Sequence, residues 1–157
     1  MIKKRVLVFS LLVCNMILFA QDNKRVAIGL GPEWNMDSRF NFAMGGALGL
    51  AVSIDDGFAM GLCFSASNNF TGITALEAGG IFRAYIPGKK NFGFFIQTDI
   101  GAFFILEEKE VTPMFMNGIR AGYRFLLGPD KKYFVEPYGR LGYPFAFGVG
   151  VLGGLRF

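Results

Sequence analysis

The sequence predicts an all-β protein, an eight-stranded antiparallel up-and-down β-barrel that spans a membrane. Two observations carry this prediction. Eight segments alternate large apolar residues with small or polar ones at a period of two, which places successive side chains on opposite faces of a strand. Away from the ends of these segments, charged residues fall on the small-residue face alone. The length of 157 residues, 52% of them hydrophobic and with 22 Gly and 19 Phe, suits one such domain.

Residues 1–20 have the three parts of a secretory signal peptide. Basic residues 3–5 open it, an apolar stretch follows over 6–19, and the small residue Ala20 precedes a polar segment. This stretch is shorter than the roughly 20 apolar residues that a membrane-spanning helix needs, so we expect cleavage after Ala20 instead of a retained anchor. The barrel then occupies residues 21–157.

Cys14 ends a stretch, Leu-Leu-Val-Cys, that loosely resembles a bacterial lipobox, in which the cysteine is lipidated. The bulky Val13 stands where such motifs carry a small residue, so an apolar residue within a cleaved leader is the simpler interpretation. Cleavage would leave Cys63 as the one cysteine of the mature sequence, which excludes an intramolecular disulfide and a cysteine-based metal site.

The eight alternating segments follow the leader and are separated by turn signals. The second shows the pattern best, because every other residue from Phe40 to Ile54 except Gly46 is large. Clusters of Gly, Pro, Asp, Asn and Lys mark turns after the second, fourth and sixth segments. The predicted strands are 24–34, 39–54, 58–67, 73–86, 92–106, 114–127, 133–142 and 145–157.

Each segment is assigned as a strand from the large residues that share one of its faces. Membrane-crossing strands take about 9–11 residues each, so eight need roughly 80, which fits a small barrel and excludes a sixteen-stranded porin. In chain order the large faces are Val26/Ile28/Leu30/Trp34, Phe40 to Ile54, Phe58/Met60/Leu62/Phe64, Leu76/Phe82/Ile86, Phe92/Phe94/Ile96/Ile100/Phe104, Ile119/Tyr123/Phe125, Tyr133/Val135/Leu141 and Phe145/Phe147/Val149/Val151/Leu155/Phe157.

The distribution of charge decides which face meets lipid. A soluble barrel or sandwich, the alternative for an alternating pattern, would carry many charges on its outer face. Here the small-residue face is mostly Gly, Ala and Ser, which fits the narrow interior of an eight-stranded barrel, so we expect the large residues to face lipid. Apart from Lys24, Arg25 and Arg39 at strand edges, nine charged residues lie within the strands, all of them on the small face: Glu33, Glu77, Arg83, Asp99, Arg120, Arg124, Glu136, Arg140 and Arg156.

We expect these nine residues to form a structural ionic network in the lumen, because an unpaired buried charge is costly. The hairpin between the sixth and seventh strands places Arg124 opposite Glu136, which predicts an ion pair. Asp99 falls opposite or within one residue of Arg120, and we expect it to bridge Arg120 and Arg140. A gated or conducting pore is the alternative.

The chemistry of most enzyme classes is missing. The sequence contains no histidine, which excludes His-dependent triads and His metal sites. Of the 16 basic residues three belong to the leader, and the 13 that remain nearly balance 12 acidic ones, so nucleic acid is not an expected partner. We therefore predict no enzymatic activity and no catalytic, cofactor-binding or metal-binding residue.

The end of the chain carries a resemblance to a known group of proteins. Residues 133–138, Tyr-Phe-Val-Glu-Pro-Tyr, and the glycine-rich segment 148–157 resemble small bacterial outer-membrane β-barrel proteins of the OmpA-, OmpX- and OmpW-like groups. The resemblance implies a location in the bacterial outer membrane, with outer-membrane lipid and the barrel assembly machinery as partners. It also implies that Leu155 and Phe157 form the signal that this machinery reads. We expect a monomer.

Two functions remain open from the sequence. The first is a non-enzymatic barrel with a structural role in the envelope or a surface-interaction role, its lumen plugged by charge. The second is a narrow channel or conduit for small apolar solutes, which the OmpW-like resemblance allows. An even strand number places both termini in the periplasm and the short connections near 35–38, 68–72, 107–113 and 143–144 outside.

Overall fold

The computed structural model describes residues 26–157 except 38–40, 71, 90–91 and 108–109, so the predicted leader and Cys14 lie outside the described residues. No helix within this described part is long and apolar enough to cross a membrane. The chain forms eight strands: β1 (Val26–Asp37), β2 (Phe42–Ser53), β3 (Phe58–Asn68), β4 (Thr74–Lys89), β5 (Phe92–Glu107), β6 (Glu110–Leu127), β7 (Tyr133–Tyr143) and β8 (Phe145–Arg156).

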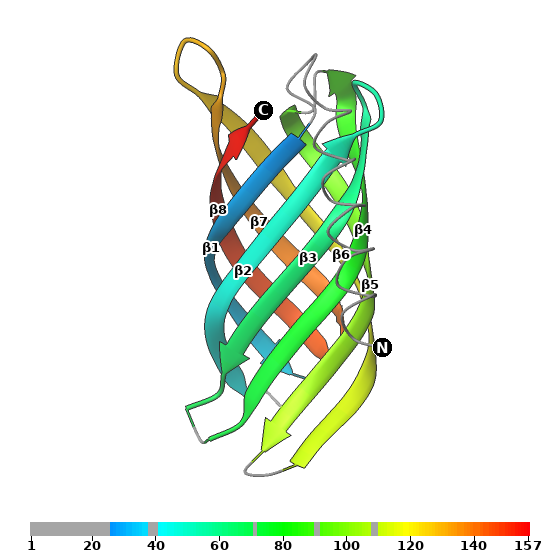
Figure 1. The fold of residues 1–157 in the computed structure, drawn as a ribbon, viewed down its shortest axis with the longest axis vertical. Coiled ribbons are helices and arrows are strands. Elements are labelled where there is room, and N and C mark those ends of the chain that lie inside the picture. The colour runs from blue at the N-terminus through cyan, green and yellow to red at the C-terminus, as the bar shows by residue number, and fades with distance from the viewer. Residues whose placement is uncertain (1–25, 38–40, 71, 90–91, 108–109) are drawn as a thin grey trace, which may run out of the picture.

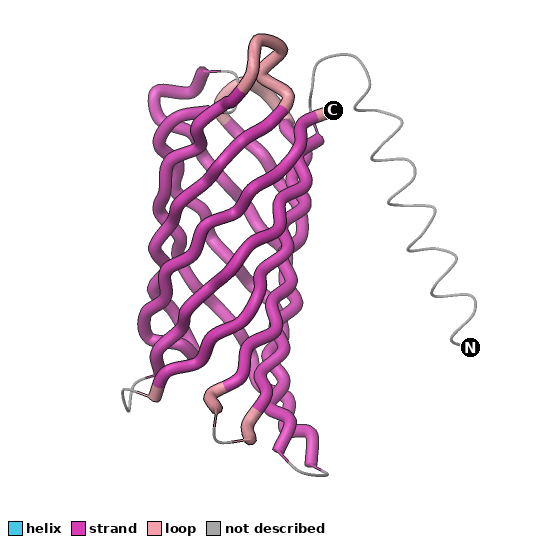
Figure 2. Tube along the Cα trace, turned by 90° about the vertical axis from the view of Figure 1, so that its left-hand side faces the viewer, coloured by secondary structure: helices cyan, strands magenta, loops and turns pink. Residues whose placement is uncertain are grey.

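The strands close into one antiparallel barrel in which sequence neighbours pair and β8 returns to pair with β1. Figures 1 and 2 show the strands tilted around the central axis, with β1 beginning and β8 ending at the same end of the barrel. The Phe157 amide donates to the Val26 carbonyl at 2.8 Å, and the Val26 amide donates back at 3.2 Å. Closure leaves the sheet without an open edge. The predicted fold, an eight-stranded antiparallel up-and-down barrel, is confirmed.

The largest difference in strand boundaries is at the start of β6, predicted at 114. Glu107 pairs with Glu110, so the β5–β6 ladder continues to the tip of this hairpin and β6 begins four residues earlier. The tighter hairpin shifts the register between the two strands. Gln97 therefore lies opposite Arg120, whereas Asp99 lies opposite Gly118.

Burial alternates along each strand as the sequence pattern requires, with large apolar side chains outward. Leu30 is 65% exposed and Ile100 is 59% exposed, and similar residues face outward on every strand. Two residues that we assigned to this outer face are instead buried. Val26 is one, although its parity in β1 is that of the exposed Leu30; Phe145 is the other.

Phe145 turns inward because the β1–β8 ladder is irregular at that end. Met36 lies opposite Phe147 and the next residue, Asp37, lies opposite Phe145, so Ala146 has no opposite residue in β1. Such a bulge re-aims the side chains that follow it. The Phe145 ring packs edge-on against Phe103, with 5.3 Å between ring centroids.

The glycine-rich face suggested that small residues line the whole interior, but large side chains also point inward. Strands β2 and β3 contribute alanines, whereas β4, β5, β7 and β8 also send large rings inward. Inward glycines make the room for these rings: a Cβ atom on Gly122 would lie 2.7 Å from Phe95 Cζ, and one on Gly150 would lie 2.5 Å from the Tyr138 hydroxyl. The buried inward aromatic residues are Tyr85, Phe95, Phe103, Phe134, Tyr138 and Phe145.

Candidate functional site

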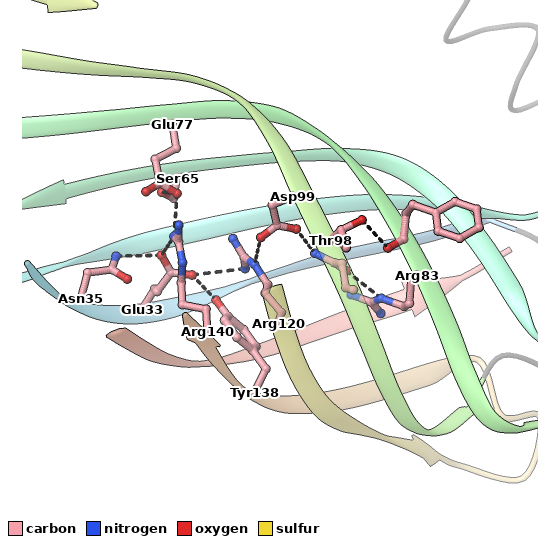
Figure 3. A network of polar contacts seen from close by, with 12 residues as sticks. Glu33, Asn35, Ser65, Glu77, Arg83, Thr98, Asp99, Arg120, Tyr138 and Arg140 are labelled. Atoms are coloured by element: carbon pink, nitrogen blue, oxygen red, sulfur yellow. Dashed lines mark hydrogen bonds and ion pairs between the residues drawn. The ribbon is translucent and has the colours of Figure 1, made fainter. Parts of the chain in front are cut away.

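All nine charged residues predicted for the lumen are buried inside the barrel. Their positions follow from strand parity, because each lies an even number of residues from another inward position of its strand. Figure 3 shows that side chains from opposite walls point toward one another across the interior. The ion pairs among them join eight residues, four carboxylates and four guanidinium groups: Glu33, Glu77, Asp99, Glu136, Arg83, Arg120, Arg124 and Arg140.

Glu33 of β1 is the centre of the first group in this network (Figure 3). It accepts hydrogen bonds from Arg120 Nη1 at 3.2 Å and Arg140 Nη1 at 3.1 Å. The Tyr138 hydroxyl donates at 2.5 Å and Asn35 Nδ2 at 2.8 Å. Arg120 and Arg140 lie directly opposite each other in the β6–β7 pair, where like charges repel. The Glu33 carboxylate of β1 therefore bridges two neighbouring cations and offsets part of their repulsion.

Arg140 differs from our expectation in its partners. It donates from Nη1 to Glu77 Oε2 at 2.6 Å as well as to Glu33, so it lies between these two carboxylates. Asp99 accepts from Arg120 Nε at 2.5 Å but forms no ion pair with Arg140. The predicted Asp99–Arg120 contact is therefore present, and the predicted Asp99–Arg140 contact is wrong. Hairpin spacing could predict only contacts between neighbouring strands, whereas β4 and β1 reach Arg140 across the lumen.

Glu136 of β7 is the centre of the second group. Arg124 Nε, its expected partner from the adjacent strand, lies 2.6 Å from Glu136 Oε2. Arg83 reaches the same carboxylate from β4 through two hydrogen bonds of 2.8 Å each, the bidentate geometry that is strongest for this pair. The Arg83 guanidinium also lies 4.1 Å from the centroid of the Phe95 ring, and Arg124 lies 4.4 Å from that of Phe134.

Gln97 connects the two groups. Its Oε1 accepts from Arg83 Nε at 2.8 Å, and its Nε2 donates to Asp99 Oδ1 at 2.5 Å. The polar contacts therefore run without a break from Ser65, which donates to Glu77, to the Arg124–Glu136 pair. The ninth residue, Arg156, is buried near the end of β8.

Sequence reasoning missed the neutral members of the network. The alternation of inward and outward positions could have found them. Each lies on the inward face, either two residues from a predicted charged residue in the same strand or opposite one in the neighbouring strand. These residues are Asn35, Ser65, Gln97 and Tyr138.

Several buried polar atoms in this region have no hydrogen-bond partner in the structure. They gather toward the barrel end opposite the termini, on Asn35 Oδ1, Ser67 Oγ, Glu77 Oε1 and Arg140 Nε and Nη2. Among the described residues, no group of three or more His, Cys, Asp or Glu is placed to hold a metal ion. The carboxylates of the network form ion pairs with arginines of other strands, and such pairs cross-link those strands.

Comparison with solved structures shows the same fold at low sequence identity. The N-terminal β-barrel domain of Pseudomonas aeruginosa OprF is 16% identical with a TM-score of 0.60, covering 86% of this chain and 98% of that one. Neisserial surface protein A is 9% identical with a TM-score of 0.57, covering 83% and 94%. A de novo designed protein, TMB2.3, is 12% identical with a TM-score of 0.51, covering 87% and 98%. No family model matches the chain, and the search of curated proteins gave no match.

The expected resemblance to small outer-membrane barrels is thus confirmed at the level of fold. A natural surface protein and a designed one share this architecture, so the fold by itself does not assign a function.

Proposed function

We propose that the protein is a non-enzymatic integral β-barrel of the bacterial outer membrane, with a structural or surface-interaction role and a lumen closed by its ionic network. The observation that carries this proposal is the set of ion pairs that cross the interior. Glu33 of β1 and Glu77 of β4 both bond to Arg140 of β7, and Arg83 of β4 bonds to Glu136 of β7. Walls held together by buried, paired side chains leave little space for solute to pass.

The outer surface supports placement in a membrane. Exposed apolar side chains encircle the barrel over all eight strands, far beyond the few hundred Å² of a typical soluble surface patch. Aromatic residues lie near strand ends, where the interfacial girdles of membrane barrels belong, among them Trp34, Tyr133, Tyr143 and Phe157. We therefore infer that lipid covers this surface, with both termini on the periplasmic side.

Single-channel recording in planar bilayers tests the closed lumen. The wild-type barrel should give no current steps above background. A variant with Glu33, Arg120 and Arg140 all replaced by alanine loses the central group and serves as the conducting control. Its folded state is checked by the heat-dependent gel mobility typical of closed barrels. Wild-type steps as large as those of the variant would contradict the closed lumen and favour the alternative, a conduit for small apolar solutes.

Cell fractionation tests the location. The protein should appear in the outer-membrane fraction, migrate faster before heating than after, and begin at Gln21 by N-terminal sequencing if the leader is cleaved after Ala20. A soluble product without a mobility shift would overturn the membrane placement. Recovery of Cys14 in a lipid-modified mature protein would overturn cleavage after Ala20 but would not affect the membrane placement.

We further propose that Leu155 and Phe157 serve as the signal to the barrel assembly machinery. In the folded barrel Leu155 is paired on both sides, with Ile28 and Tyr133, so its backbone is free to pair with a partner strand only before closure. Phe157→Ala should lower the amount assembled in cells but leave folding of the purified chain into lipid unchanged. Equal loss in both assays would mean a role in stability alone.

A further inference from the structure

We propose that β6 has an open strand edge beyond the mouth of the barrel, and that Pro113 prevents this edge from pairing with the same edge of a second copy of the chain. The β5–β6 hairpin extends past the other strands at the end opposite the termini (Figure 1). Closure removes unpaired edges from the wall of a barrel, but a hairpin that projects from the wall keeps one. Free backbone groups along such an edge are a template for a further strand.

The ladders on the two sides of β6 end at different places. On the β5 side the ladder continues to the tip of the hairpin, where Glu107 pairs with Glu110. On the β7 side it ends at Asn117, which lies opposite Tyr143 at the end of β7. Within the described part of the chain, no strand pairs with residues 110–116 on that side. This part of β6 therefore has a neighbouring strand along one edge alone.

The exposure of the side chains supports a segment that projects from the barrel. Buried and exposed residues alternate along the wall, whereas residues 110–113 are exposed on both faces of β6. Val111 and Phe115 are each 60% exposed, although both are apolar. An exposed apolar strand with a free edge associates with other strands unless a local feature prevents it.

The alternation of the strand determines which residues direct their backbone groups toward the open edge. A Cβ atom on Gly142 of β7 would collide with the Asn117 carbonyl oxygen, so this carbonyl points toward β7. In an antiparallel ladder the N–H and C=O groups of one residue point to the same side, and those of the next residue point to the other. Val111, Pro113 and Phe115 therefore point their backbone groups to the side of β6 that has no neighbour.

Pro113 lies in the middle of this edge and has no N–H to donate. A two-fold interface uses the same patch on both copies, so the edge needs no other protein as its partner. Pairing about Pro113 would bring Val111 of each copy opposite Phe115 of the other, but the central pair would have no donor on either strand. Proline on an edge strand is one of the features by which natural sheets avoid such pairing. Pro113 therefore keeps the projecting hairpin monomeric.

Sedimentation velocity of the full chain, folded in detergent micelles, tests the role of Pro113. The wild type should sediment as a monomer, whereas Pro113→Val, which restores the central N–H, should form dimers at high protein concentration. The matched control is Pro137→Val, because Pro137 also lies in a strand but β6 and β8 flank it in the closed wall. A dimeric wild type, a monomeric Pro113→Val, or equal association of Pro137→Val would overturn the proposal.

A second proline shows whether the association uses this edge. In the Pro113→Val chain, Phe115→Pro removes another N–H that points to the open side, and it should restore the monomer. Phe115→Leu keeps that N–H and an apolar side chain, and it should leave the dimer in place. Each variant is first checked for the folded gel mobility. Equal effects of the two substitutions at Phe115 would mean that edge pairing does not join the copies, and the proposal would fail.

Hydrogen exchange measured by NMR tests the open edge without any variant, so a variant that fails to fold leaves the proposal testable. In the wild-type monomer, the amides of Val111 and Phe115 should exchange rapidly. Those of Thr112 and Met114, which point toward β5, should be protected. Equal protection of all these amides would mean that the edge is covered, which contradicts the proposal. In the Pro113→Val dimer the amides of Val111 and Phe115 should become protected as well.

Discussion

Substituting glutamine for Glu136 removes the carboxylate that Arg83 and Arg124 share, and leaves two buried guanidinium groups without an anion. Both arginines are 4% exposed, so water cannot readily replace the lost partner. Breaking a buried ion pair on one side costs about 3–5 kcal/mol. We therefore expect the free energy of unfolding of Glu136→Gln to fall by about 3–5 kcal/mol relative to the wild type.

Urea unfolding in lipid bilayers measures this loss. Trp34 is the one tryptophan of the sequence and faces outward, so its fluorescence reports departure from lipid. With a slope of about 2 kcal/mol per molar urea, the midpoint should fall by roughly 1.5–2.5 M. The control Asp56→Asn, at an exposed turn, should change stability by less than about 0.5 kcal/mol.

A second substitution separates charge from packing. Adding Arg124→Met to Glu136→Gln removes one of the two orphaned cations, so the double variant should be more stable than Glu136→Gln alone. If Glu136→Gln costs no more than the turn control, the guanidinium groups are solvated and the reasoning about a buried network fails.

Four further substitutions test the packing and the lipid face. Gly150→Ala should destabilise the barrel by about 1–3 kcal/mol because its Cβ would meet the ring of Tyr138, whereas Gly153→Ala, with nothing within 4 Å, should be nearly neutral in the same urea assay. Phe95→Ala should cost about 3–5 kcal/mol because its fully buried ring leaves a cavity; a smaller loss would mean that the interior collapses around it. Ile100→Arg, near the middle of β5 on the outer face, should cost about 2–4 kcal/mol in bilayers and little in a detergent that solvates the charge, and equal costs in both would argue against lipid contact.

The sequence predicted contacts within hairpins and failed for contacts across the lumen. Arg124 and Glu136 meet as the β6–β7 spacing requires, since both registers follow from one short turn. Arg83 could not be paired with Glu136 in this way, because 53 residues separate them and only closure brings β4 opposite β7. The expected Asp99–Arg140 contact was wrong for a related reason, because Arg140 bonds instead to Glu33 of β1 and Glu77 of β4, strands that only closure brings near it.

By itself the sequence determined strand number, order and the inward parity of the charged residues, because a period of two is a local property of an extended chain. It could not determine which inward residues touch, or that Phe145 would leave its face at a bulge. Those outcomes depend on barrel closure, which sets the distances between strands that are remote in sequence and makes the space inside finite. Large rings, inward glycines and ion pairs then fill that limited space together.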